Sequence, residues 1–169
     1  MTLMLFFLSG CLSENHDESV KPSGDSSLLL LPDDPGDTEP VQFSGVLQAH
    51  NNSRKLVRVK QIVWSTKLAV YAQEWANNLQ RLNCETDHRP DDRYGENIVL
   101  LQKQQATPQD VVAHWEAERN NFDMITKQCV PGKACSHYAQ IISPITKAIG
   151  CGVGRCTNRM VWVCNYDPW

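Results

Sequence analysis

The sequence predicts a fold of mixed class, α+β or a three-layer α/β/α sandwich, and two observations support this prediction. Apolar residues recur at helical spacing in several segments of the first two thirds of the chain. Runs rich in β-branched and aromatic residues dominate the last third. The length of 169 residues accommodates one globular domain and a tail.

Three helices are expected from periodicity and capping signals. The first covers residues 46–57, with Ser44 as its N-cap. The second begins after Ser65, a good N-cap, and has one broad apolar stripe, formed by Leu68, Ala69, Ala72, Trp75, Ala76 and Leu79. The third begins at Thr107-Pro108-Gln109-Asp110, where threonine caps the helix, proline occupies its first position and the acid closes a capping box.

Four short runs are typical of strands: residues 98–101, 139–143, 148–154 and 160–166. The last two runs are adjacent in the chain, so we expect them to form a hairpin. Strands and helices therefore belong to one domain, which we assign to residues 44–169.

One face of the third helix contains a carboxylate among core residues, namely Val111, Trp115, Glu118 and Phe122. An unpaired buried carboxylate is costly, so Glu118 needs a partner or a role unless it lies at the edge of the stripe and reaches water. Three candidate partners lie beside expected element boundaries: His88, Glu96 and His137.

Charge is distributed unevenly along the chain. Residues 1–43 contain eight acidic residues and one basic residue, whereas residues 44–169 contain eleven acidic and fifteen basic residues. The bases are scattered, which argues against a nucleic-acid partner. No apolar run in the sequence is close in length to the roughly 20 residues that a membrane-spanning helix needs.

The N-terminus has the character of an export signal. Residues 1–11 contain a short apolar run that ends in Leu8-Ser9-Gly10-Cys11, which resembles the lipobox of bacterial lipoproteins. We expect lipidation of Cys11 and a membrane contact through that anchor alone; the alternative is a plain secretory signal with a chance cysteine. Residues 12–43 are acidic and rich in Ser, Pro and Gly, as expected for a flexible tether.

Five motifs occur in order along the domain: His50-Asn51-x-x-Arg54, Tyr94-Gly95-Glu96-Asn97-Ile98, Trp115-x-x-Glu118, Cys135-Ser136-His137-Tyr138-Ala139-Gln140 and Cys164-Asn165-Tyr166-Asp167-Pro168. Together they resemble the signature of the CAP superfamily (SCP domain), which contains the cysteine-rich secretory proteins, antigen 5 and the pathogenesis-related 1 proteins. The resemblance extends over the whole domain. Combined with the lipobox, it indicates an exported bacterial member, either secreted or held in the cell envelope.

The resemblance implies an α/β/α sandwich whose central cleft contains His88, Glu96, Glu118 and His137. Two imidazoles in a cleft suit a divalent metal such as Zn²⁺, with the carboxylates as further ligands or as a base acting on bound water. If the protein is an enzyme, Glu96 and Glu118 are the candidate catalytic residues. Ala139 stands where the family usually has threonine.

The resemblance leaves two functions open. An exported binding or effector module would take a lipid, a sterol or a protein at grooves outside the cleft. A metal-dependent, peptidase-like hydrolase would use the four cleft residues. We favour the non-enzymatic module, because catalysis is poorly established among proteins that share these residues.

Six of the seven cysteines lie in the domain, and we expect them to form Cys129–Cys135, Cys151–Cys164 and Cys84–Cys156. The first pair flanks a Pro-Gly turn. The second pair lies opposite across a two-residue turn at Thr157-Asn158, and the third pair remains. The resemblance to the plant members implies the same set. Disulfides require an oxidising compartment, which agrees with export.

Overall fold

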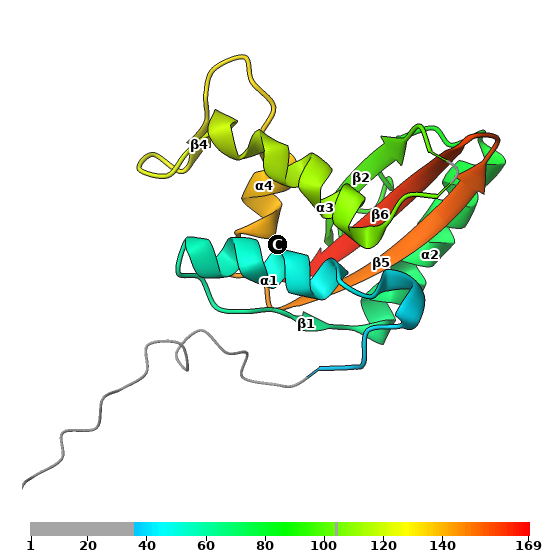
Figure 1. Cartoon of the computed structure of the whole chain (residues 1–169), viewed down its shortest axis with the longest axis horizontal. Helices are drawn as coiled ribbons and strands as arrows, with labels where there is room; N and C mark the ends of the chain where they lie inside the picture. The colour runs from blue at the N-terminus through cyan, green and yellow to red at the C-terminus, as the bar shows by residue number, and fades with distance from the viewer. Residues whose placement is uncertain (1–35, 104) are drawn as a thin grey trace, which may run out of the picture.

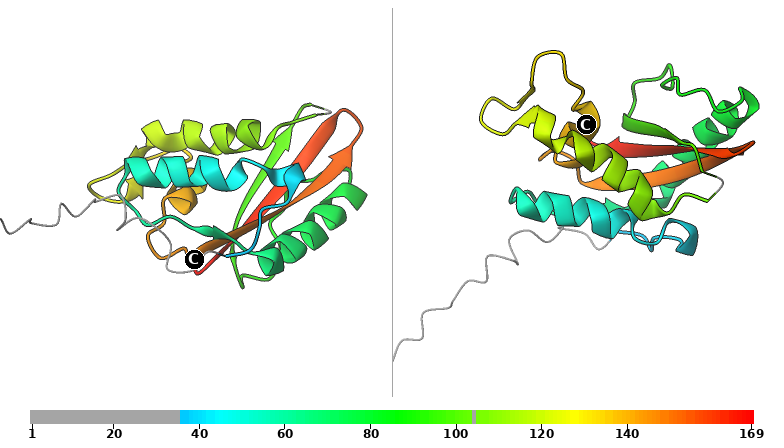
Figure 2. Two further views of the ribbon diagram at one scale, coloured as in Figure 1. Left: turned by 60° about the horizontal axis from the view of Figure 1, so that its bottom comes forward. Right: turned by 45° about the horizontal axis from the view of Figure 1, so that its top comes forward.

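The centre of the structure is a four-stranded sheet with helices on both faces (Figures 1 and 2). The structure, a computed structural model, describes residues 36–103 and 105–169. The strand order is β1-β5-β6-β2, with β1 parallel to β5 and the other neighbours antiparallel. The strands are β1 (Val63–Trp64), β2 (Gly95–Leu101), β5 (Ala148–Cys156) and β6 (Arg159–Asp167). The predicted three-layer α/β/α sandwich is confirmed.

One face of the sheet is covered by α2 (Thr66–Arg81), which lies on β5 and β6. The side of β5 toward this helix has a glycine at every second position: Gly150, Gly152 and Gly154. A Cβ atom at Gly150 would lie 2.1 Å from the amide nitrogen of Ala69, and one at Gly152 would lie 2.4 Å from Cα of Gln73. The helix backbone therefore lies directly on the strand, and larger residues would push the layers apart.

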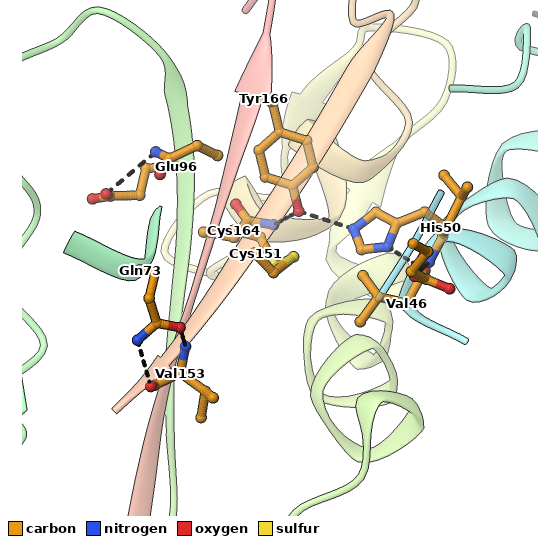
Figure 3. Close-up of a disulfide and its surroundings, with 12 residues drawn as sticks. Val46, His50, Gln73, Glu96, Cys151, Val153, Cys164 and Tyr166 are labelled. Atoms are coloured by element: carbon orange, nitrogen blue, oxygen red, sulfur yellow. Dashed lines mark hydrogen bonds between the residues drawn. A yellow bond between two sulfur atoms is a disulfide. The ribbon is translucent and has the colours of Figure 1, made fainter. Parts of the chain in front are cut away.

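Gln73 of α2 also completes the open edge of β5. Its side-chain amide donates to the carbonyl of Val153 at 2.9 Å and accepts from the same residue's N–H at 3.0 Å (Figure 3). The partner strand β1 has only two residues, so it does not reach this part of β5. The glutamine thus satisfies backbone groups that an edge strand would otherwise expose.

The other face is covered by α1 (Val46–Leu56), α3 (Pro108–Glu116) and α4 (Ser136–Ile141), with short 3₁₀ turns η2 (Val41–Phe43) and η3 (Ala117–Asn121) (Figure 2). Side chains of β6 alternate between the two layers. Those that face this larger core are Met160, Trp162, Cys164 and Tyr166, whereas Val161 and Val163 face α2. The predicted hairpin of the last two strands is confirmed, with Cys151 directly opposite Cys164.

The strand predicted at residues 139–143 is wrong, because residues 136–141 form the helix α4. Its buried residues are Tyr138, Ile141 and the following Ile142. These lie at i, i+3 and i+4, which places them on one helix face. The short β-branched run misled the prediction, because so few residues fit either period.

The start of α1 also differs from its prediction. Ser44 is not the N-cap. Gly45 occupies that position with φ 103°, and it has no side chain that could cap the helix. The carboxylate of Glu39 instead accepts hydrogen bonds from the N–H groups of Gly45 at 2.9 Å and Leu47 at 2.7 Å. The predicted caps of the other two helices are confirmed: Ser65 caps α2, and Thr107 and Asp110 form the capping box of α3.

The end of the expected tether, residues 12–43, is part of the folded domain. Asp37 donates its N–H to the carbonyl of Trp64 at 2.9 Å, and its carboxylate accepts from the N–H of Thr66 at 2.7 Å. Phe43 is buried and stacks on Trp64. The domain therefore begins at least seven residues before residue 44, at Asp37. The signal segment, Cys11 and tether residues 12–35 lie outside the described residues.

A short hairpin of β3 (Phe122–Asp123) and β4 (Gln128–Cys129) projects from the body of the molecule beside α4 (Figure 1). The structure contains the disulfides Cys84–Cys156, Cys129–Cys135 and Cys151–Cys164, the same three pairs that the sequence analysis expects. Figure 3 shows the last of these between the two long strands. Within the described residues, no helix combines the length and the apolar character that a bilayer crossing requires.

Candidate functional site

The four candidate residues form two His–Glu pairs. In one pair, Nδ1 of His137 lies 2.7 Å from Oε1 of Glu118. In the other, Nδ1 of His88 lies 2.8 Å from Oε1 of Glu96. The exposed fractions of the histidine side chains differ, at 27% for His137 and 63% for His88, whereas both carboxylates are largely buried.

Glu118 holds the N-terminus of α4. Its Oε2 accepts from the N–H groups of His137 at 3.0 Å and Tyr138 at 3.3 Å, which are first-turn donors without partners in the helix. The helix has no cap of its own, because the side chain of Cys135 at the N-cap position accepts no capping hydrogen bond. A carboxylate at a helix N-terminus also interacts favourably with the helix dipole. Glu118 therefore fixes both the helix and the imidazole of its first turn.

The sequence predicts that Glu118 lies on one face of the third helix, but this helix ends before Glu118. The α-helix α3 ends at Glu116, Glu118 lies in the 3₁₀ turn η3, and Phe122 begins β3. The tighter turn still directs Glu118 to α4, where its side chain is 15% exposed. Glu118 therefore has protein partners, and it keeps a small exposed fraction at the end of the stripe.

Glu96 is held in a similar way at the start of β2. Its Oε1 accepts from the N–H of Arg89 at 3.1 Å as well as contacting His88, and its Oε2 lies 3.4 Å from Nδ2 of Asn165. The side chain is 8% exposed. Both carboxylates thus have a protein contact on each oxygen.

A buried polar network lies beside the two pairs, and Figure 3 shows its Tyr166–His50 part. Asn97, the neighbour of Glu96, donates through Nδ2 to the carbonyl of His137 at 3.0 Å and to the hydroxyl of Tyr166 at 3.1 Å. That hydroxyl lies 2.9 Å from Nε2 of His50, whose Nδ1 lies 2.8 Å from the carbonyl of Val46. Because a carbonyl only accepts, Nδ1 of His50 carries the proton and Nε2 accepts from Tyr166.

Burial determines the charge of this network. Desolvation lowers the pKa of His50 to about 4, and it raises the pKa of Tyr166 well above its usual value of 10. Both groups are therefore neutral at physiological pH. Trp115 of α3 stacks on His137, with ring centroids 6.2 Å apart and an interplanar angle of 20°.

Asn97, Tyr166 and His50 belong to the sequence motifs, but the sequence alone predicts no role for them. One signal could have singled out Asn97: it is a polar residue at an inward position of a strand whose following residues, Ile98 and Val99, are buried and apolar. Buried polar groups are nearly always hydrogen-bonded, so such a residue predicts a specific partner.

The side-chain types in the two pairs suit a divalent cation, but too few of them lie together to complete its coordination. With Nδ1 directed at a carboxylate, the neutral imidazoles of His88 and His137 leave Nε2 as the electron-pair donor, as in many metal-binding histidines. However, no group of three or more His, Cys, Asp or Glu side chains converges as a metal site within residues 36–103 and 105–169. The expected four-residue cluster is instead two pairs.

Comparison with known proteins agrees with the fold. A family model described as the cysteine-rich secretory protein family, CAP, matches residues 47–166. A pathogenesis-related protein of the PR-1 type from Sambucus nigra is 36% identical over 123 residues, which cover 72% of this chain and 73% of the relative. This relative is a plant protein, so it lends no support to the bacterial origin expected from the Cys11 motif.

Solved structures share the architecture. Venom allergen-like protein 4 of Schistosoma mansoni has a TM-score of 0.65 and 22% identity, over 77% of this chain and 90% of that chain. The crystal structure of NaASP2 with Zn²⁺ has a TM-score of 0.61 and 18% identity, over 82% of this chain and 84% of that chain. The chain belongs to the cysteine-rich secretory protein (CAP) family and is of the pathogenesis-related 1 type.

Proposed function

We propose that the protein is an exported, non-enzymatic binding or effector module whose His88 and His137 imidazoles take a divalent cation such as Zn²⁺. The observation that carries this proposal is the hydrogen bonding of the two carboxylates. Glu96 and Glu118 accept hydrogen bonds from backbone N–H groups and orient the histidines, which is a positioning role. Lipid, sterol or protein ligands would bind at grooves outside these pairs.

Export is supported by the family and by the cysteines. The family takes its name from secretory proteins, and the three disulfides are stable in an oxidising compartment. A lipid anchor at Cys11 would add a membrane attachment; detergent partitioning of the wild type and of Cys11→Ser distinguishes it from plain secretion.

The residues that would hold the cation are the two histidines, through Nε2. When bound, such an ion supplies positive charge and Lewis acidity, and water would complete its coordination. Two protein ligands give weaker binding than the four of a structural zinc site. The crystal structure of NaASP2 with Zn²⁺ supports cation binding as a property within this fold.

The hydrolase alternative requires a carboxylate that can take a proton from water. A general base needs a free acceptor position within hydrogen-bond reach of that water. The oxygens of Glu118 already accept from two peptide N–H groups and contact an imidazole. This arrangement favours the binding module over catalysis by Glu118.

Calorimetry tests the proposal. Zn²⁺ should bind the wild type at pH 7.5, and His88→Ala or His137→Ala should each remove most of the affinity. His114→Ala is the matched control, because His114 is an exposed residue of α3 outside both pairs. Affinity should fall in acid, because a metal needs neutral imidazole.

Two results would contradict the proposal. Undiminished Zn²⁺ binding by the His88→Ala, His137→Ala double variant would assign the cation to other residues. Turnover of a peptide library by the Zn²⁺-loaded wild type, with none by the metal-free protein, would instead favour the hydrolase.

A further inference from the structure

A second candidate site lies on the face of the sheet that α2 covers, opposite α1 and α3 (Figure 2). A cavity of about 460 Å³ opens there between α2 and the loop that leads from α2 to β2. The helix lines it with Glu74, Trp75, Asn78 and Arg81, and the loop lines it with residues 89–91. The volume lies within the range of small-molecule sites, roughly 300–1,000 Å³.

The loop is fixed to the helix, so the cavity is preformed. Nε1 of Trp75 donates to the carbonyl of Asp87 at 2.9 Å. Nη1 of Arg89 donates to the carbonyl of Tyr71 at 3.1 Å, and its guanidinium carbon lies 3.7 Å from the centroid of the Tyr71 ring. The disulfide Cys84–Cys156 ties the start of the loop to β5. A site whose walls are already ordered loses little conformational entropy when a ligand binds.

The charged side chains of the lining balance one another. Glu74 and Asp91 are acidic, and Arg81 and Arg89 are basic. One acid and one base, Glu74 and Arg89, form an ion pair at 3.5 Å across the boundary between helix and loop. The lining therefore has no excess of either charge, which favours an uncharged ligand over an anion or a cation.

The polar groups of the lining offer both donors and acceptors. Oδ1 of Asn78 accepts from Arg81 at 3.1 Å, whereas its Nδ2 has no partner among the described residues and is a donor for a ligand. Glu74 is 62% exposed, and its Oε2 is the oxygen that contacts Arg89, which leaves Oε1 as an acceptor. A hydroxyl group both donates and accepts, so a ligand with several hydroxyls matches this mixed set.

Trp75 adds an aromatic surface to the cavity. Its ring is half-buried and packs against the smaller core beneath α2, and its bond to Asp87 fixes the orientation of the indole. A pyranose ring has hydroxyl groups around its edge and a face of C–H groups, and such an apolar face packs well on an indole. The lining therefore combines the two features that a sugar requires.

We propose that this cavity binds one uncharged sugar unit of a saccharide, with a C–H face of the ring against Trp75 and its hydroxyl groups at Glu74, Asn78 and Arg81. The proposal is independent of the cation at the histidines, because no residue of the two His–Glu pairs lines this cavity. It identifies the ligand by its chemistry alone: a neutral polyhydroxylated ring.

The experiment uses the full chain and three neutral trisaccharides, cellotriose, mannotriose and chitotriose, with the acidic trigalacturonate for comparison. In a nitrogen-15 NMR titration, at least one neutral probe should shift the indole N–H signal of Trp75, and it should bind more tightly than trigalacturonate. Asn78→Ala should weaken this binding about fivefold, as expected for the loss of one hydrogen bond. Trp75→Leu, with its fold checked by circular dichroism, should weaken it at least about tenfold.

Asn77→Ala is the matched control, because Asn77 is an exposed residue of the same helix, next to Asn78, and does not line the cavity. It should leave the affinity unchanged. Wild-type affinity in Asn78→Ala would overturn the proposal. Tighter binding of trigalacturonate than of every neutral probe would do the same, as would an unchanged Trp75 signal with all three neutral probes at millimolar concentration.

Discussion

Replacement of Glu118 by glutamine should change both the stability of the domain and the tautomer of His137. The carboxylate accepts two peptide N–H groups of α4 on Oε2 and contacts Nδ1 of His137 on Oε1. Glutamine has nearly the same shape but only one oxygen. If this oxygen keeps the peptide N–H groups, the NH₂ group faces Nδ1, and the imidazole must accept there and carry its proton on Nε2.

The structure allows an estimate of the cost. The helix keeps a neutral acceptor at its N-terminus but loses the charge-assisted part of two bonds and the interaction with the helix dipole. We expect a loss of about 1–2 kcal/mol in the free energy of unfolding. For a domain of this size, that corresponds to a decrease in Tm of roughly 3–7 °C.

Two measurements check this expectation. Thermal unfolding followed by circular dichroism gives the stability, and nitrogen-15 NMR of the imidazole gives the tautomer. Glu116→Gln is the matched control, because Glu116 lies two residues before Glu118 and, within residues 36–103 and 105–169, no hydrogen bond from α4 reaches it. If both variants unfold at the same temperature, or if His137 in Glu118→Gln still carries its proton on Nδ1, the positioning role of Glu118 is refuted.

Two further predictions concern stability. Because burial lowers the pKa of His50 to about 4 while the unfolded chain has the ordinary value near 6.5, the unfolded state alone binds a proton in between. Stability should therefore fall as pH decreases from about 6.5 towards 4, by up to about 3 kcal/mol in denaturant titrations, and His50→Gln, unlike His114→Ala, should flatten this dependence. Non-reducing peptide mapping should find Cys84–Cys156, Cys129–Cys135 and Cys151–Cys164. Removal of the first pair, with a sequence separation of 72, should cost about 4 kcal/mol, against about 2.5 kcal/mol for the second, with a separation of 6. Equal costs would contradict the loop-entropy reasoning.

Several features that the sequence predicted correctly depend on residues close together in the chain. The turn at Thr157-Asn158 sets the register of β5 and β6, and Thr107 and Asp110 cap α3 from three residues apart. A feature that it missed depends on a residue outside the element concerned. Glu39 caps α1 in place of Ser44 from the segment that precedes the helix, where the capping signals of a helix start are not sought.

The candidate site follows the same division. The resemblance to the family identifies His88, Glu96, Glu118 and His137. Their arrangement in pairs depends on contacts between side chains that are up to 19 residues apart in the sequence. The helix α4 shows most clearly what could not be predicted from the sequence alone. Its six residues are too few for hydrophobic periodicity to distinguish helix from strand, and Glu118 supplies the N-terminal bonds that its own sequence lacks.

The register of β2 determines how the two pairs are held relative to each other. Glu96 lies opposite Asn165 and Asn97 lies opposite Cys164, so the pleat directs these consecutive residues to opposite faces of the sheet. One of them orients His88 and the other holds the carbonyl of His137. A slip of one residue would exchange the two faces and separate both histidines from their supports. The disulfide Cys151–Cys164, which is buried beside this position, fixes the register of β6 against β5, whereas the register of β2 on β6 depends on backbone pairing and on the burial of its inward side chains.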